Sequence, residues 1–319
     1  MTAVPTARLR LDGRLVAAML ALVLVLAIGA WRNPEFLGAE NILNVLRQNA
    51  VLMLLAIGMT FVIISGGIDL SVGSILAFTS VVTVKLAPEG LPFAAGAAVL
   101  TGLGLGMVNG LLVARLKIAP FIATLVTLLA LRGLTLAVFG EETVALTEGR
   151  SKVLAFGRGF VLGLPVQVPI VAAALVAAWV LLTQTRFGRA VYAVGGSEDS
   201  ARLRGIDVAA TRFAVYGLSG AIAGLAGFVF AVRIGAGITN YGLGLELDAI
   251  TAVALGGTLL SGGVGGVAGT AVGVLIVGFL FNLFNLDATL DTFLQKVVRG
   301  GLLTVVVVMQ GTILQRRRQ

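Results

Sequence analysis

The sequence predicts an all-α, polytopic membrane protein. Of its 319 residues, 58% are hydrophobic and only 12% are charged, whereas soluble domains carry about 25% charged residues. The apolar residues gather into about ten segments, most of them long enough to cross a bilayer as a helix. The 43 glycines are a third indication, because small residues allow helices to approach one another closely in lipid.

The candidate spans follow one another along the chain, which we treat as one transmembrane domain over residues 1–319. The first, residues 15–31, lacks a small-residue cleavage site followed by a soluble domain, so it is expected to be a retained span and not a signal peptide. The others cover residues 44–65, a stretch ending near 87, then 92–114, 119–140, 166–184, 212–233, 248–261, 266–285 and 293–311. The segment at 248–261 is short and weakly apolar.

Basic residues lie beside the spans and predict their orientation. They cluster at 115–117, in a loop at 185–212 and at 316–318, and such clusters stay in the cytoplasm. Ten crossings from a cytoplasmic tail (residues 1–14) put all three clusters inside, together with both termini, and leave a mixed-charge loop at 141–164 outside. Because this orientation accounts for the net charge of +8, we expect no nucleic-acid partner.

Two glycine-rich blocks interrupt the apolar pattern and predict broken helices near 66–71 and 244–250. Gly-Ile-Asp-Leu-Ser at 67–71 resembles Gly-Leu-Glu-Leu-Asp at 244–248, and Asn109 and Arg132 are echoed at a similar offset by Asn282 and Arg299. An offset of five spans turns the second half upside down, which predicts two inverted five-span repeats. Transporters are often built so, with the polar breaks facing the permeation path. Coincidence among abundant small residues is the alternative.

The hydrophilic stretch at 186–212 predicts a short helix between two spans. Ser197 can cap its N-terminus, Glu198 suits the positive end of the helix dipole, and Gly205 is placed to end it. A soluble partner could bind such a helix and move the membrane spans on either side of it. The alternative is an amphipathic loop lying on the lipid headgroups.

A few polar residues are candidates for a solute path. A carboxylate at Asp69 is costly in lipid, so it must face water, a partner or a helix N-terminus. Capping of the next span by Asp69 and Ser71 competes with solute contact, and asparagines can equally hold helices together. Arg132 and Arg233 are expected to be snorkelling anchors. The substrate-path candidates are Asp69, Ser71, Asn109, Thr124, Glu246, Asp248 and Asn282.

Several functions are disfavoured by missing residue types. The chain has no histidine and no cysteine, so imidazole acid–base catalysis, thiol nucleophiles and ordinary zinc sites are excluded. The glycines at 256–266 are not followed by the Lys-Ser/Thr of a phosphate-binding loop. We therefore expect no enzyme activity, no cofactor and no metal in this chain.

Seven blocks in order resemble the membrane permeases of ribose/xylose/arabinose-type ABC importers, which are related more distantly to branched-chain amino-acid permeases. They are Gly-Gly-Ile-Asp-Leu-Ser-Val-Gly-Ser at 66–74, Asn-Gly at 109–110, Pro-Phe-Ile-Ala-Thr-Leu at 120–125, Thr-Arg-Phe-Gly-Arg at 185–189, Ala-Arg-Leu and Gly-Ile at 201–206, Glu-Leu-Asp-Ala-Ile at 246–250 and Gly-Gly at 256–257. The resemblance covers about residues 40–310.

The resemblance implies a monosaccharide importer in a bacterial inner membrane. It implies a second permease copy, identical or not, two ABC ATPase subunits that carry ATP and Mg²⁺, and a periplasmic sugar-binding protein. The short helix would then be the coupling helix on the ATPase. Its coupling residues would be Ser197, Glu198, Ala201, Arg202, Leu203, Gly205 and Ile206.

Three other functions are alternatives to monosaccharide import. Import of branched-chain amino acids is the nearest alternative. An ion-coupled secondary transporter usually has acidic residues deep in its spans, whereas here they lie at breaks or ends. A lipid-modifying enzyme would need clustered carboxylates or a nucleophile beside a base, and neither pattern occurs.

Overall fold

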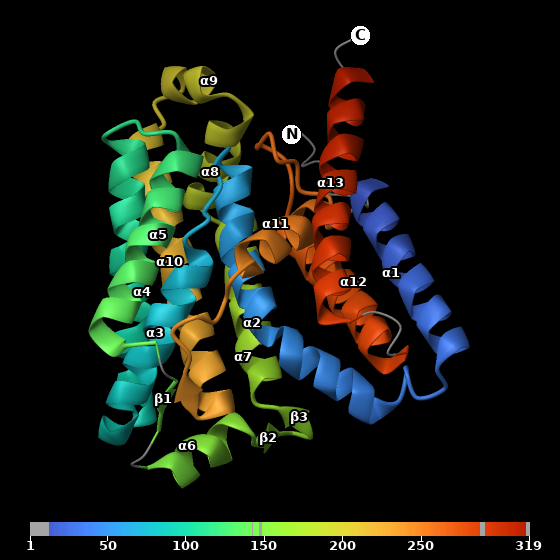
Figure 1. Cartoon of the computed structure of the whole chain (residues 1–319). Coiled ribbons are helices and arrows are strands. Elements are labelled where there is room, and N and C mark those ends of the chain that lie inside the picture. Colours follow the sequence, from blue (N-terminus) through green and yellow to red (C-terminus); the bar gives the residue numbers. More distant parts are fainter. Residues whose placement is uncertain (1–12, 142, 147–148, 288–290, 317–319) are drawn as a thin grey trace, which may run out of the picture.

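The computed structural model describes residues 13–141, 143–146, 149–287 and 291–316, which form a bundle of helices (Figure 1). Eight helices in this part of the chain are long and apolar enough to cross a membrane, so the predicted all-α polytopic class is confirmed. They are α1 (Gly13–Arg32), α2 (Ala39–Ile64), α3 (Val72–Leu86) with the short η1 (Ala87–Glu89), α4 (Leu91–Ala114), α5 (Pro120–Phe139), α7 (Gln167–Gln184), α10 (Val208–Ile234) and α12 (Val267–Asp287).

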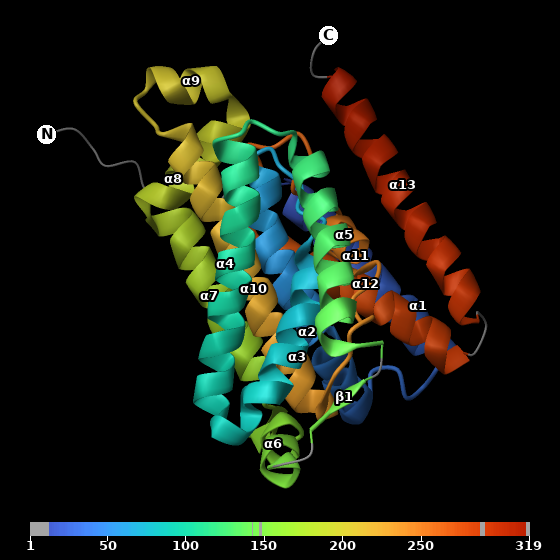
Figure 2. The same cartoon turned by 60° about the vertical axis from the view of Figure 1, so that its left-hand side comes forward.

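The remaining elements lie mostly at the two ends of the bundle. The further helices are α6 (Arg150–Gly157), α8 (Arg186–Gly196), α9 (Glu198–Leu203), α11 (Leu245–Leu255) and α13 (Thr292–Arg316). Strand β1 (Val144–Ala145) pairs antiparallel with β4 (Ala236–Gly237), and β2 (Phe160–Val161) with β3 (Leu164–Pro165). In both views α9 and the C-terminal end of α13 lie at one end of the bundle and α6 lies at the other (Figures 1 and 2).

Helices α2 and α10 form the centre of the bundle. Both are buried over most of their length, and α10 packs against α2, α3 and α4. Against α4 the two backbones touch: a Cβ added at Gly106 would lie 2.2 Å from the carbonyl oxygen of Tyr216, and one at Gly220 equally close to that of Gly102. Glycines at these positions therefore set the approach of two membrane helices.

The outer helices present apolar side chains to their surroundings. Leu20 of α1, Leu129 of α5 and Val176 of α7 are each more than half exposed. Lipid tails accept such surfaces without cost. Trp31, at the end of α1, is 83% exposed, which is typical of the aromatic side chains that lie at a membrane interface.

Several elements of the described residues differ from the sequence-based expectations. The segment at 186–196 is a helix, because Thr185 caps it and the buried Val191 and Val194 lie on one face. Helix α11 ends at Leu255, short of the predicted span at 248–261, and its 11 residues rise only about 16 Å. The predicted external loop contains α6 and β1–β3. Most of the predicted tail 1–14 and the final arginines of the basic C-terminus lie outside the described residues.

Candidate functional site

Three caps build a rigid turn at one end of the bundle. The Thr185 hydroxyl accepts from Gly188 N–H at 3.1 Å to start α8, the Ser197 hydroxyl accepts from Ser200 N–H at 3.3 Å to start α9, and Asp207 starts α10. Helix α9 ends at Leu203, and Gly205 follows two residues later with a φ of +74°, a left-handed conformation that favours glycine. The predicted short helix, its cap and its terminating glycine are thus confirmed.

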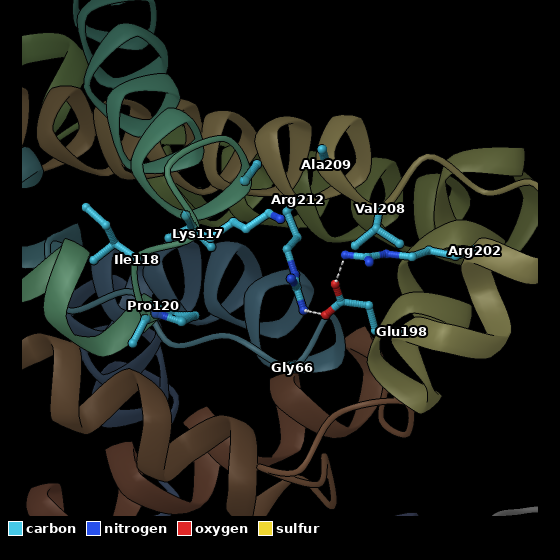
Figure 3. A pocket seen from close by; sticks show the side chains of 12 residues that line it. Gly66, Lys117, Ile118, Pro120, Glu198, Arg202, Val208, Ala209 and Arg212 are labelled. Atoms are coloured by element: carbon cyan, nitrogen blue, oxygen red, sulfur yellow. Dashed lines mark hydrogen bonds and ion pairs between the residues drawn. The ribbon is translucent and has the colours of Figure 1, made fainter.

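The charged side chains of α9 tie it to α10. Glu198 pairs with Arg202 on the same helix and with Arg212 of α10, the latter at 2.7 Å. Figure 3 shows Glu198 between the two guanidinium groups, with Lys117 of the α4–α5 loop across a cavity of about 340 Å³. Three cations face one carboxylate, so this end of the bundle carries an excess of positive charge.

The predicted coupling residues divide into buried and exposed ones. Ala201 is buried against Val194 and Val208, with Ile206 packed beside them. Leu203 is 90% exposed, so α9 holds to the bundle by one face and presents the other to the surroundings. Tyr192 donates to the carbonyl of Gly265 at 2.7 Å, and burial raises the pKa of its phenol.

The first break (residues 65–71) is closed by hydrogen bonds around Asp69. This fully buried carboxylate accepts from Ser71 N–H at 3.0 Å, from the Ser71 hydroxyl at 2.6 Å and from the Ser219 hydroxyl of α10 at 2.9 Å. Asn109 of α4 donates to Ser71 Oγ at 2.7 Å. One carboxylate therefore joins α3, α4 and α10, and these contacts account for its burial without a solute.

Thr124 and Tyr216 complete the closure. The Thr124 hydroxyl donates to the Pro120 carbonyl at 2.9 Å and, weakly, to that of Ile68 at 3.4 Å. Tyr216 donates to the same Ile68 carbonyl at 3.3 Å. The expectation that the Ser71 side chain caps α3 is wrong: it makes no cap bond, because its hydroxyl donates to Asp69.

The second break lies at residues 235–244 and not at the predicted 244–250, because the chain is helical again from Leu245. One arginine supports this break, and a second lies just before it. Arg132 of α5 donates from Nη1 to the carbonyls of Thr239 at 3.2 Å and Tyr241 at 2.7 Å, and Arg233 donates to the Arg47 carbonyl at 3.1 Å. Both arginines donate to backbone carbonyls of the protein, a structural role that their sequence context did not predict. Irregular backbone at membrane depth needs such partners, because lipid supplies none.

Helix α11, which follows the second break, carries two acidic residues in its first turn. Asp248 pairs with Arg299 of α13 at 2.7 Å. Glu246 accepts from Gly244 N–H at 3.2 Å through Oε1, while its Oε2 is buried and accepts from no described group. Negative charge is favourable at this end of a helix.

Gln310 of α13 supports the other end of α11. Its Nε2 donates to the carbonyls of Ala254 at 3.2 Å and Thr258 at 3.0 Å, and its Oε1 accepts from Leu260 N–H at 3.1 Å. The Ala254 carbonyl already accepts from Gly257 N–H at 3.1 Å, so Gln310 gives it a second donor and ties the turn after α11 to α13. Through these bonds and the Asp248–Arg299 pair, α13 contacts α11 near both of its ends.

A polar cavity of about 180 Å³ lies beside the second break, between α2, α12 and α13. It is close to where α12 ends and α13 begins, in the half of the bundle away from α9 (Figure 1). Its polar lining consists of the Asp248–Arg299 pair, Tyr241 and five amide side chains, which are Gln48, Asn49, Asn282, Asn285 and Gln295. The cavity thus concentrates hydrogen-bond donors and acceptors within a largely apolar bundle.

The structure thus separates the seven substrate-path candidates. Four gather at the first break: Asp69, Ser71, Asn109 and Thr124. Asp248 and Asn282 line the polar cavity, and Asn282 also makes two reciprocal 2.9 Å amide bonds with Asn41 of α2. Glu246 is not among the cavity's lining residues.

Sequence reasoning missed several residues. Ser219 and Gln310 lie in strongly apolar stretches, and an uncharged polar residue in such a stretch is the signal that could have found them. Gln48 lies in the polar start of α2 between Arg47 and Asn49, where nothing distinguishes it. In the sequence, Arg299 stands out only by its match to Arg132 in the predicted repeat. A charged residue within a span nevertheless needs a partner. Tyr241 lies in the glycine-rich segment and carried no sequence signal.

Comparison with known proteins assigns the chain to a family. Residues 41–307 match the family model described as branched-chain amino acid transport system / permease component. The chain is 42% identical to the ribose import permease of Bacillus subtilis (strain 168), over 95% of each chain, and 39% identical to that of Escherichia coli (strain K12), over 95% of this chain and 94% of the relative. The D-allose transport permease of Escherichia coli (strain K12) is 39% identical over 92% and 90%. No solved structure matches significantly.

The chain therefore belongs to this permease family of transport systems. Its relatives are named as permeases, so the expectation of a transport component and not an enzyme is confirmed. The eight apolar helices make it a multi-pass membrane protein.

Proposed function

We propose that this chain is the permease subunit of an ATP-driven importer that moves a monosaccharide across a bacterial inner membrane. The observation that carries the proposal is the end-to-end match to ribose import permeases, at about 40% identity over 95% of the chain. Matches to allose and fructose permeases keep the substrate within the monosaccharides.

Branched-chain amino acids are the alternative substrate, because the family description names them. Charged side chains free to pair with both ends of a zwitterionic amino acid would favour such a substrate. In the polar cavity the carboxylate of Asp248 and the guanidinium of Arg299 pair with one another, and the rest of its polar lining is uncharged. The cavity chemistry therefore favours a neutral polyol.

The proposed complex contains two permease copies, two ATPase subunits with bound ATP and Mg²⁺, and a sugar-binding protein. The loop at 185–212 with α9 is cytoplasmic and receives the ATPase, and the segment at 141–164 faces the binding protein. The loop at 115–119, α9 and the C-terminal end of α13 all lie at one end of the bundle (Figure 2), which agrees with the retention of positive charge inside. Both termini and the tail 1–14 are cytoplasmic in this proposal.

The proposed architecture is ten crossings in two inverted repeats. In Figure 1, α2 runs towards the end that carries α9 and α3 returns, whereas α10 runs away from that end and the segment after it climbs back to α11, which lies across the middle of the bundle. The first break lies near α9 and the second near α6. Helix α11 with the segment before it makes the eighth crossing, and α13 the tenth.

A mechanism follows from the rigid connection of α9 to α10. The Glu198–Arg212 pair and the buried Ala201 join the two helices, and α10 is an unbroken helix of 27 residues that includes Ser219, which donates to Asp69. When the ATPases close on ATP and push α9, we expect α10 to move as a unit and carry the first break with it. Such rigid-body motion is how packed helices change between inward-open and outward-open states.

The test uses the turn at Gly205. A β-branched residue in a left-handed conformation costs about 1–2 kcal/mol, so Gly205→Val should distort the end of α9, whereas Gly205→Asn tolerates the geometry. The chain is purified with its ATPase in lipid, and sugar uptake and ATP hydrolysis are measured with the binding protein. We expect Gly205→Val to lose at least fivefold of stimulated hydrolysis and uptake, and Gly205→Asn to retain both. Full coupling in Gly205→Val would remove α9 from the mechanism.

A further inference from the structure

We propose that the polar cavity between α2, α12 and α13 is a monosaccharide-binding subsite on the route through the permease. The inference rests on the proposed function and adds the place where the chain itself holds the sugar. The cavity has a volume of about 180 Å³ and lies in the half of the bundle away from α9. In the proposed orientation this is the outer half, which sugar enters first.

The cavity's chemistry matches a neutral, hydroxyl-rich solute. Each amide offers both donors and acceptors, so it can bond to a hydroxyl in either sense. The buried Nε–H of Arg299 donates to no described group, and so it remains available to a ligand. The Arg299 guanidinium is fixed in place by Asp248 and by the Phe281 ring, whose centroid lies 4.5 Å away.

The amides differ in how far the protein already uses them. Asn49 donates to the Val45 carbonyl at 2.9 Å, Gln295 donates to Asn285 at 2.8 Å, and Asn282 is paired with Asn41. Gln48 is exposed and makes no hydrogen bond or ion pair with the described chain. Its side chain can therefore turn to a sugar without breaking a protein contact.

Gly278 of α12 lines the cavity and makes a close approach to α2. A Cβ at this position would lie 2.6 Å from Asn49 Nδ2, so a larger residue would push the amide from its place. The close approach fixes the Asn49 amide against α12. A preorganised polar surface of this kind is what a small neutral ligand needs for specific binding.

The first test is transport by Gln48→Leu in proteoliposomes that contain the permease, its ATPase and its binding protein. The probes are D-ribose, D-allose and D-fructose, the sugars named for the relatives. Asn44→Leu is the matched control, because it removes an amide one turn earlier on α2 and outside the cavity. We expect Gln48→Leu to lower uptake at least tenfold, and Asn44→Leu to remain within twofold of wild type.

The second test exploits the absence of cysteine from the chain. Gln48→Cys and Asn44→Cys each carry a single thiol, which is labelled from outside with a membrane-impermeant thiosulfonate reagent. We expect the sugar that wild type transports to slow labelling of Gln48→Cys at least threefold, and to leave Asn44→Cys unaffected. An osmotically matched concentration of betaine is the control solute.

The outcomes separate the two proposals. Wild type that moves none of the three sugars with ATP would overturn the proposed function itself. Wild type that transports a sugar, beside a Gln48→Leu variant with normal uptake and a Gln48→Cys thiol that the sugar does not protect, would overturn the subsite alone. Loss of uptake with sugar-protected labelling would support it.

Discussion

The two helix breaks are built from different chemistry, although their sequences resemble one another. The first break is closed by hydroxyls and one amide around a single carboxylate, Asp69. The second is supported by Arg132 and Arg299, faces Glu246 and Asp248, and lies beside a polar cavity. Among the described residues it contains three buried side-chain atoms without a partner, against one at the first break. We infer that the first break serves as a structural joint between helices, and the second as a solute-binding site.

The largest effect is expected at the joint. Asp69→Ala leaves the buried donors of Ser71 and Ser219 without their acceptor, and each unsatisfied group costs about 1–3 kcal/mol. We expect at least about 3 kcal/mol of lost stability, seen as a lower midpoint of thermal unfolding in detergent. Asp199→Ala, which removes an exposed carboxylate of α9, should leave the midpoint unchanged. A stable Asp69→Ala variant that lacks uptake would instead make Asp69 a solute contact.

A smaller loss of stability with a larger loss of transport is expected at the site. Arg299→Gln leaves the Asp248 carboxylate, which is 8% exposed, without its partner and costs about 1–3 kcal/mol. The double variant Asp248→Asn/Arg299→Gln leaves no unpaired charge, so it should recover part of that stability, as removal of both partners often does. Uptake per folded molecule should stay at least tenfold low in both. Recovery of uptake together with stability would show that the pair is only structural.

The smallest effect is expected where α13 holds the C-terminal end of α11. Gln310→Leu removes three hydrogen bonds worth about 0.5–1.5 kcal/mol each before relaxation. We expect faster amide hydrogen exchange confined to residues 254–260 and uptake reduced about twofold. Gln184→Leu, which alters an exposed glutamine of α7 that has no such contact in the described chain, is the control. Unchanged exchange would mean that the end of α11 is stable without the hydrogen bonds of Gln310.

Local features of the structure could be predicted from the sequence. Ser197 and Gly205 start and end α9 as expected, because capping depends on neighbouring residues. The apolar segments predicted the membrane helices for the same reason. The break near 66–71 was also visible, since the Gly-Gly pair precedes the only acidic residue between α2 and α3.

Contacts between distant segments could not be predicted in this way. Arg132 resembles any arginine near a span end, and its bonds to Thr239 and Tyr241 depend on how α5 packs over a segment more than a hundred residues away. The contact that holds the turn after α11 was equally invisible, because its partner Gln310 lies about fifty residues further along the chain. The cavity likewise arises only when α2, α12 and α13 meet.

The most direct test of the account is uptake of radiolabelled D-ribose, D-allose and D-fructose by proteoliposomes that contain this chain with its ATPase. We expect accumulation of at least one of the sugars that requires both ATP and the binding protein, and no accumulation of leucine. ATP-dependent accumulation of leucine without any sugar would assign the chain to amino-acid import. Uptake driven by an ion gradient in the absence of the ATPase would contradict the account as a whole.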